Sequence, residues 1–278
     1  MALFNWGKIK TNQGTLTRTW IEDCLKEMGN QNILFQNECQ LQFLLAWAIQ
    51  NFFQGKYDIY LEECTFAINS PKLERWYTDI IVEDKETEEC IAIELKYKTA
   101  KLCDNTGKVI LLEQSAEDFG KFDFLWDVNR NEMLVYENQK LLSEENAIID
   151  SNNYRNNPIT FSSNACEFKR PGKIKKAYSI MLTNCEKYWV PGKPTQADDF
   201  KIAQGRDIQA NQNLRWELQN GKIKSDNIRN TKRGRTLCFL KDYQCEWKAY
   251  HTFTNYAKNG GKKAKKNNNE FKFLIIEI

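Results

Sequence analysis

Three charged residues lie inside two apolar stretches of this sequence, where a charge costs free energy unless it finds a partner. Asp79 interrupts the stretch YTDIIVED (77–84), and Glu94 and Lys96 interrupt ECIAIELKYKT (89–99). Successive side chains of a strand point to opposite faces, so Glu94 and Lys96 project in parallel from one face. Two carboxylates and a lysine can bind a hard divalent cation and act on its water or on developing charge. This is the chemistry of phosphodiester hydrolysis.

A short polar segment joins the two stretches and predicts a β-hairpin. With a two-residue turn at Glu86 and Thr87, Asp79 lies directly opposite Glu94. Residues directly opposite each other point to the same face, and two carboxylates this close repel unless a cation lies between them. A one-residue shift in register would separate them. Taken alone, Glu94 and Lys96 also fit a half-exposed strand with a surface ion pair.

The elements that must position these residues follow from hydrophobic periodicity. Helical spacing predicts helices at 15–29, 37–53 and 115–132. Apolar runs predict strands at 57–66, 75–84, 89–99, 177–184 and 271–278 and within 237–250. The Asn/Ser-rich stretch 151–164 and the Gly/Lys/Asn-rich stretch 259–269 predict loops. This order predicts an α/β protein, in which a central sheet carries helices on its faces.

Local signals set the expected helix ends. Gly29 predicts the end of the first helix. Asn37 followed by Gln40, and Ser115 followed by Asp118, match the capping-box pattern at the starts of the second and third helices.

Composition narrows the class of protein. A chain of 278 residues that is 41% hydrophobic suits a single domain, with a core at about 15–190 and a basic elaboration at about 191–278. No signal-peptide pattern and no long apolar run is present, which predicts a soluble cytoplasmic protein. Nine cysteines without a Cys-x-x-Cys pair argue against a disulfide framework or a structural zinc site. His251 is the only histidine, so catalysis would rest on carboxylates, lysines and a metal.

Positive charge is concentrated toward the C-terminus. Residues 222–278 contain 14 Lys or Arg against 5 Asp or Glu, whereas residues 1–221 contain 26 against 32. This asymmetry predicts either an anionic partner or a solubilising surface. No aromatic residue interrupts 222–235, so its basic residues suit phosphate contact better than base stacking. The candidate nucleic-acid contacts are Arg206, Arg215, Lys222, Lys224, Arg229, Lys232, Arg233 and Arg235.

Asp79, fourteen intervening residues and then Glu94-Leu95-Lys96 resemble the signature of the PD-(D/E)xK, or restriction-endonuclease-like, nucleases. A leading helix, two strands that carry the acids and a following helix fit the same pattern, although Thr78 stands where the family has proline. Further stretches look similar to uncharacterised bacterial proteins usually placed in this superfamily. They are DFGKFDFLWDVNRNE, AYSIMLTNCEKYW, DDFKIAQGRDIQANQNLRWE and EFKFLIIEI. The resemblance implies a restriction-endonuclease-like core, a central mixed β-sheet flanked by helices, with a C-terminal strand-rich elaboration.

Residue roles follow from the resemblance. It implies that Asp79 and Glu94 are the metal ligands with the backbone carbonyl of Leu95, and that Lys96 activates water or stabilises charge. Glu38 matches a glutamate that the family often carries on its leading helix, where it binds through water or holds a second metal. The helix dipole alone also favours an acid at that position. The implied cofactor is Mg²⁺ or Mn²⁺.

Two flanking residues have open roles. Lys98 shares the face of Lys96 and is either a phosphate contact or a solvated charge at the strand end. Gln114 precedes the third helix, where some members of the family use a glutamine; otherwise it is an exposed flank.

The leading hypothesis is therefore a metal-dependent endonuclease that acts on DNA in preference to RNA. The alternative is a catalytically inactive nucleic-acid-binding protein that retains the nuclease fold. A structural protein with surface ion pairs leaves the charges inside both apolar strands unexplained. No membrane partner is expected, and a homodimer is compatible with the sequence.

Overall fold

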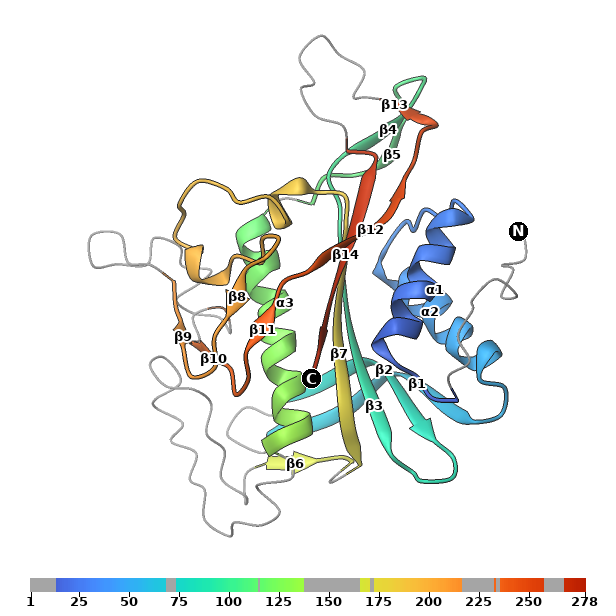
Figure 1. Ribbon diagram of the computed structural model, residues 1–278, viewed down its shortest axis with the longest axis vertical. Coiled ribbons are helices and arrows are strands. Elements are labelled where there is room, and N and C mark those ends of the chain that lie inside the picture. Colours follow the sequence, from blue (N-terminus) through green and yellow to red (C-terminus); the bar gives the residue numbers. More distant parts are fainter. Residues whose placement is uncertain are drawn as a thin grey trace.

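The structure, a computed structural model, describes residues 14–68, 74–114, 116–137, 166–170, 173–216, 233, 236–257 and 268–278. Helices cover both faces of a central sheet, with α1 and α2 on one side and α3 on the other (Figure 1). The helices are α1 (Arg18–Asn30), α2 (Glu38–Phe52) and α3 (Glu117–Glu132). The strands of the sheet are β1 (Tyr57–Ile68), β2 (Glu74–Asp84), β3 (Cys90–Lys98), β6 (Cys166–Phe168), β7 (Ile174–Thr183), β12 (Trp247–Thr252) and β14 (Glu270–Glu277).

The central sheet is mixed, which confirms the expected α/β class. Its strands lie in the order β12-β14-β7-β3-β2-β1-β6. Among the described strands of this sheet, β3 and β7 are the one pair that is parallel, and the long connection between them contains α3. Parallel neighbours need such a crossover, whereas β1, β2 and β3 form an antiparallel meander.

The C-terminal part adds strands to this same sheet. β14 lies between β7 and β12, and the predicted strand at 271–278 is therefore confirmed. The predicted strand region 237–250 is broken into β10 (Leu237–Cys238), β11 (Tyr243–Gln244) and β12. The remaining small sheets pair β10 with β9 (Asn213–Leu214), β11 with β8 (Asp207–Ile208), and β4 (Leu102–Asp104) with β5 (Val109–Leu111) and β13 (Tyr256–Ala257). Short helical turns are η2 (Met133–Glu137), η3 (Glu186–Tyr188) and η4 (Asp198–Phe200).

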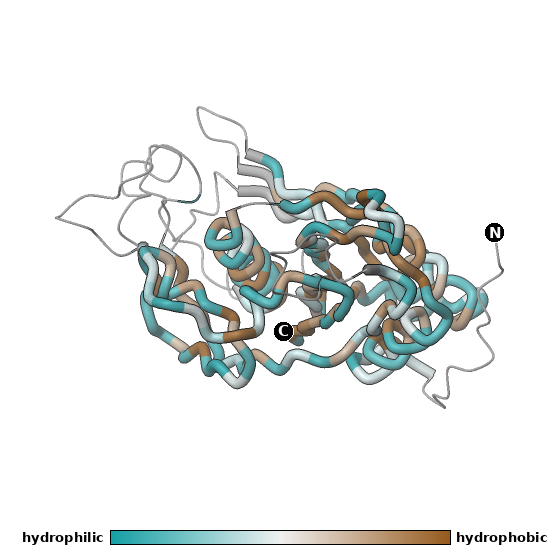
Figure 2. The backbone as a smooth tube through the Cα atoms, turned by 90° about the horizontal axis from the view of Figure 1, so that it is seen from above, coloured by the Kyte–Doolittle hydropathy of each residue, from teal (hydrophilic) through white to brown (hydrophobic). Residues whose placement is uncertain are grey.

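Two hydrophobic cores lie on opposite faces of the sheet. In β3, Ile93 and Leu95 pack toward α1 and α2, whereas Cys90 and Ala92 pack toward α3. Figure 2 shows the hydrophobic stretches of the strands between the helices and hydrophilic stretches in the outer turns. This alternation assigns Glu94 and Lys96 to the α3 face.

The start of α2 agrees with its sequence signal. The side chain of Asn37 accepts a hydrogen bond from the Gln40 amide at 2.9 Å, as an N-cap should. In a capping box the side chain at the third helical position also accepts from the amide of the N-cap residue. Here Gln40 Oε1 accepts instead from the amide one residue earlier, that of Gln36, at 2.7 Å. The cap fixes the first turn of α2, which carries Glu38.

Gly29 does not end α1, which continues to Asn30. A Cβ atom at Gly29 would lie 2.3 Å from the carbonyl oxygen of Tyr250 in β12. The glycine therefore permits close packing of α1 on the sheet, and the prediction of a helix stop was wrong.

The third helix begins without a side-chain cap. Its N-cap residue is Ala116, which adopts the left-handed conformation with φ of 71°. Ser115, predicted to start a capping box, lies outside the described residues. The apolar residues at helical spacing in α3 form a buried stripe, in which Phe122 packs against Phe200 and Trp216, and Trp126 packs against Trp76 of β2.

The hairpin between β2 and β3 has the predicted register but a longer turn. Ile80 pairs with Ile93 and Glu83 with Cys90, as predicted, but the ladder ends at Ile80–Ile93, one residue before Asp79 and Glu94. The Asp84 amide donates to the Glu89 carbonyl at 2.9 Å, which closes the turn. Four residues, 85–88, thus replace the two-residue turn without shifting the pairing.

Some predictions lie outside the described residues. The loop at 151–164 does so entirely, and of 259–269 only the last two residues are described. Within the described part of the chain, no helix is both long and apolar enough to cross a membrane.

Candidate active site

The strands β2 and β3 part immediately beyond the pair Ile80–Ile93. From there β2 pairs with β1, whereas β3 continues along β7 as far as Lys98. Asp79 and Glu94 are the first residues past this fork. Their strand neighbours Ile81 and Ala92 belong to the core on the α3 side. The two strands therefore share no ladder pair at the level of both carboxylates.

Parting strands leave backbone groups that must find other partners. The Leu95 amide donates to Asp79 Oδ2 at 2.5 Å, and the Tyr97 amide donates to Glu38 Oε2 at 2.6 Å. From α2, Gln42 Nε2 donates to the Asp79 carbonyl at 2.7 Å. Asp79 and Glu38 thus have a structural task, because each carboxylate satisfies an amide of β3.

Glu94 and Lys96 form a closed set of ion pairs with α3. Lys96 Nζ lies 2.6 Å from Asp127 Oδ2, and Arg130 Nη2 lies 2.9 Å from Glu94 Oε1. Arg130 Nη2 also lies 2.8 Å from Asp127 Oδ1, which closes the set. Asp127 and Arg130 are three residues apart on one face of the helix, so they meet two alternate residues of the strand. These contacts dock α3 on β3.

The six charged residues at the fork carry a net negative charge. Four carboxylates and two cationic groups leave a formal charge of −2 when all are ionised. We call the following residues the fork cluster: Glu38, Asp79, Glu94, Lys96, Asp127 and Arg130.

Burial, together with the neighbouring charges, perturbs the acids of the fork cluster. Burial raises the pKa of Asp79 to about 7, and the carboxylates of Asp127 and Glu38 add to the effect, while Lys96 and the Leu95 amide offset part of it. Burial, with the charges of Asp127 and Asp79, also raises the pKa of Glu94 well above its ordinary value, and Arg130 opposes this. The protein without a bound cation therefore resists ionising both carboxylates.

The bases respond in the opposite sense. Burial by itself would lower the pKa of Lys96, but the carboxylates of Asp127, Glu94 and Glu38 outweigh it and raise that pKa above its ordinary value. Lys96 is consequently an ammonium group throughout the physiological pH range. It also donates to the Leu95 carbonyl at 3.2 Å.

The donor set suits a hard divalent cation. Each carboxylate has a second oxygen, Asp79 Oδ1 and Glu94 Oε2, that accepts no hydrogen bond from the residues the structure describes. Mg²⁺ is commonly held by only one or two carboxylates, with waters and substrate oxygens completing the shell. Among the described residues, no group of three or more His, Cys, Asp or Glu is arranged to hold a metal ion, so the four carboxylates of the fork cluster do not form a ready-made metal cage.

The flanking candidates lie near the fork but make fewer contacts. Lys98 is half-buried at the end of β3. Gln114 is exposed, and its backbone amide donates to the Thr99 carbonyl at 2.8 Å. The structure therefore links neither side chain to the fork cluster.

The described arginines of the candidate nucleic-acid surface differ in their surroundings. Arg206 donates to the carbonyls of Asp198 and Asp199, both at 2.7 Å, and Arg233 forms a two-point pair with Asp123 of α3 at 3.0 and 2.8 Å. Arg215 is exposed. The other predicted contacts lie outside the described residues: Lys222, Lys224, Arg229, Lys232 and Arg235.

Sequence reasoning missed three members of the site, Gln42, Asp127 and Arg130. A signal for the last two was present, because Asp127 follows the stripe residue Trp126 and Arg130 stands one helical turn after it. Charged residues beside an apolar stripe at this spacing indicate a buried ion pair. Gln42 gave no comparable signal.

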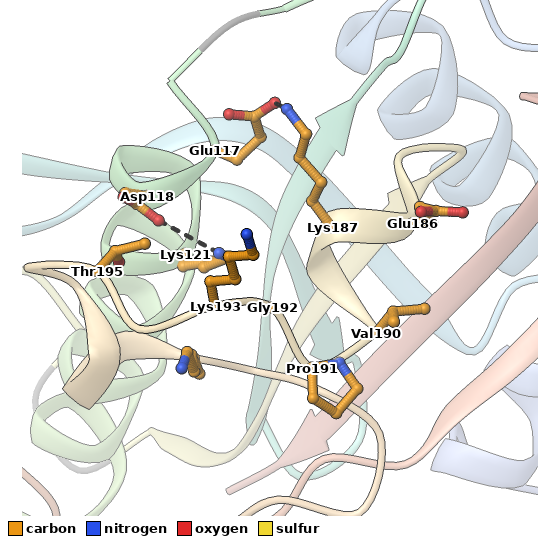
Figure 3. A pocket seen from close by; sticks show the side chains of 11 residues that line it. Glu117, Asp118, Lys121, Glu186, Lys187, Val190, Pro191, Gly192, Lys193 and Thr195 are labelled. Atoms are coloured by element: carbon orange, nitrogen blue, oxygen red, sulfur yellow. Dashed lines mark hydrogen bonds and ion pairs between the residues drawn. The ribbon is translucent and has the colours of Figure 1, made fainter. Parts of the chain in front are cut away.

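A pocket lined by charged side chains lies at the opposite end of α3 from η2 (Figure 3). Its volume is about 390 Å³, and its lysines are Lys121, Lys187, Lys193 and Lys201. Lys121 pairs with Asp118 at 3.2 Å and Lys187 pairs with Glu117. Lys121 precedes Asp127 by six residues, about 9 Å along the helix axis. The pocket is thus a neighbour of the fork cluster and not part of it.

Comparison of the chain with family models, with curated proteins and with solved structures finds no match.

Proposed function

We propose that this protein is a metal-dependent nuclease with a restriction-endonuclease-like core, and that it hydrolyses phosphodiester bonds in DNA. The observation that carries the proposal is the fork itself. Asp79, Glu94 and Lys96 belong to one cluster, at the point where two strands separate, and the acids of that cluster outnumber its bases. Burial, with a contribution from neighbouring carboxylates, raises the pKa values of Asp79 and Glu94, and a divalent cation would compensate the negative charge of the two ionised groups.

The arrangement of elements also supports the proposal. A leading helix, α2, supplies Glu38, and the adjacent strands β2 and β3 carry the two acids. The next long helix, α3, lies within the crossover to a strand parallel to β3. This order agrees with the pattern that the sequence motif resembles. The preference for DNA over RNA rests on that resemblance alone.

The residues have distinct roles in this proposal. Asp79, Glu94 and the Leu95 carbonyl would hold Mg²⁺ or Mn²⁺, which supplies an activated water and stabilises charge on the phosphate. Lys96 is held as an ammonium, so it stabilises negative charge or orients a water and does not remove a proton. Glu38 keeps β3 in place through the Tyr97 amide and adds negative charge at the fork.

A second candidate function is a nucleic-acid-binding protein without catalytic activity. The ion pairs of Glu94 and Lys96 with α3 favour it, because a structural role could retain both residues in the absence of any reaction. The two candidates differ in whether a divalent cation leads to hydrolysis.

The test is a cleavage series on plasmid DNA, single-stranded DNA and RNA with Mg²⁺, Mn²⁺ or Ca²⁺. We expect DNA cleavage with Mg²⁺ and Mn²⁺ and none with Ca²⁺, which has looser geometry and acidifies water poorly. Glu94→Gln should abolish turnover, and Lys96→Ala should lower the rate about 100-fold or more while metal binding persists. Lys176→Ala, which removes a lysine paired with Glu277 elsewhere on the sheet, is the control and should cleave normally.

Two results would reject a metal-dependent nuclease. One is cleavage by the wild-type protein in EDTA, and the other is a wild-type rate in Lys96→Ala. Binding of DNA without cleavage under any of these metals would instead support the inactive nucleic-acid-binding protein.

A further inference from the structure

Arg130 holds two carboxylates through a single nitrogen. Its Nη2 atom contacts both Glu94 Oε1 at 2.9 Å and Asp127 Oδ1 at 2.8 Å. Its Nε is buried and donates to no described residue, and the guanidinium lies 5.9 Å from the ring centre of Trp76. The strongest arginine–carboxylate pairs use two parallel N–H···O bonds. The interaction of Arg130 with Glu94 is therefore weaker than a two-point arginine–carboxylate pair.

The second ion pair of Arg130, with Asp127, becomes important when Glu94 leaves Arg130 to bind another group. A buried charge that loses its only partner is costly, because its desolvation is no longer compensated. Arg130 avoids this cost, since Asp127 already accepts from the same nitrogen and lies one helical turn away on α3. Arg130 can thus release Glu94 without becoming an isolated buried charge.

We propose that Arg130 is an internal competitor for Glu94. In the metal-free protein its guanidinium neutralises this carboxylate, and when a divalent cation binds, Arg130 gives up Glu94 and remains paired with Asp127. This inference rests on the proposed metal site and adds to it a residue that sets metal affinity. Without the positive charge of Arg130, the fork cluster would carry a formal charge of −3 in place of −2, so a cation should bind more tightly.

Arg170 provides a matched control. Its side chain is as exposed as that of Arg130, 13% in both, and it pairs with Glu83 of β2 at 2.7 Å. Glu83 lies four residues beyond Asp79, about 13 Å further along the same strand. Loss of Arg170 should weaken the sheet in a comparable way without touching the fork.

The experiment is a calorimetric titration of the full chain with Mn²⁺. We compare wild type with Arg130→Gln, Arg130→Lys and Arg170→Gln, and thermal denaturation without metal shows whether each variant is folded. We expect Arg130→Gln to bind Mn²⁺ about tenfold more tightly than wild type. Arg130→Lys, which keeps the charge, and Arg170→Gln should stay within about threefold of wild type. If Arg130→Gln does not fold, Arg130→Met, which preserves the volume without the charge, takes its place.

Equal or weaker Mn²⁺ binding in Arg130→Gln would overturn the inference and leave Arg130 as an anchor of α3. Failure of the proposed function has a different signature: neither wild type nor Arg130→Gln would bind Mn²⁺ at millimolar concentration.

Discussion

At the scale of single residues, the carboxylates of the fork have two tasks. Asp79 satisfies the Leu95 amide and Glu94 satisfies Arg130, yet both have pKa values raised by burial and by neighbouring acids. A group with a raised pKa in the folded state binds its proton more tightly there than in the unfolded chain. Ionisation of Asp79 in the metal-free folded protein therefore costs free energy at neutral pH. This cost should be measurable as a loss of folding stability.

The pH dependence of stability follows from this shift. The ordinary pKa of an aspartate is about 3.9, and that of Asp79 in the folded protein is about 7. The stability that protonated Asp79 contributes to the folded state is therefore fully present below pH ~4 and is lost as the pH rises through ~7. In EDTA, wild-type stability should fall between pH 5 and 8. Asp79→Asn should reduce that fall by at most about 3 kcal/mol, a limit that solvent screening of a half-buried group lowers.

Urea denaturation at both pH values measures the effect. Asp84→Asn is the control on the same strand. Burial alone would raise the pKa of Asp84, but hydrogen bonds from the turn amides and the charge of Lys56 together outweigh it and lower that pKa. The stability that ionised Asp84 contributes is therefore present above pH ~4 and lost below it. This pH dependence is opposite in sign to that of Asp79. Wild-type stability that rises from pH 5 to 8, with no change in Asp79→Asn, would contradict the assignment.

At the scale of elements, the site depends on how three segments meet. The β2–β3 turn sets the register, α2 supplies partners for the separated backbone groups, and α3 supplies partners for Glu94 and Lys96. Each element must be held against the sheet, and for α1, which packs beside α2, a glycine makes that contact possible. The close approach of Gly29 to Tyr250 has a measurable consequence.

Gly29→Ala should destabilise the protein even though alanine favours helix by about 1 kcal/mol. Its Cβ would lie 2.3 Å from a backbone oxygen of β12, so the helix must move away from the sheet. We expect a loss of about 2 kcal/mol in the free energy of unfolding, measured in urea. Gly192→Ala, where no atom lies within 4 Å of the added Cβ, should be neutral. A stabilised Gly29→Ala variant would show that α1 is not packed as described.

At the scale of the whole molecule, the question is how the basic segment near the C-terminus relates to the fork cluster. The strongly basic segment at 222–235 lies almost entirely outside the described residues, but Arg233 is described and is paired with Asp123 on α3, one helical turn before Asp127. The carbonyl of Arg233 also accepts from Trp216 Nε1 at 2.6 Å. Arg233 thus ties its part of the chain to α3, the helix that also carries Asp127 and Arg130.

This attachment refines how the basic segment should be tested. Arg233 should be kept, and Lys224, Lys232 and Arg235 replaced by alanine. Each lost phosphate contact reduces the slope of log affinity against log salt by about 0.9 for duplex DNA, so the triple variant should lose up to about 3 from that slope, equally on unrelated sequences. Lys26→Ala with Lys85→Ala, two exposed lysines on other elements, is the control. An unchanged slope would identify the segment as a solvated surface.

Much of the local structure was predictable from the sequence. The apolar stripes of the three helices, the Asn37 cap and the alternation of β3 are properties of short segments, whose periods of 3.6 and 2 residues reflect backbone geometry. The hairpin register also followed from local information, since the polar turn separates two apolar runs of fixed phase. These features are sufficient to bring Asp79, Glu94 and Lys96 together.

Only the tertiary structure decided what surrounds those residues. The parting of β2 and β3, the pairing of Glu94 with Arg130 and of Lys96 with Asp127, and the position of β14 inside the sheet depend on contacts between distant segments. The need for a glycine at position 29 was also not predictable from the local sequence. It arises from the backbone carbonyl of Tyr250, on a strand more than 200 residues later. The proximity of the charged residues Asp79, Glu94 and Lys96 was visible in residue types and spacing. The charge balance of the fork was not, because electrostatic interactions depend on distance and burial in space and not on separation along the chain.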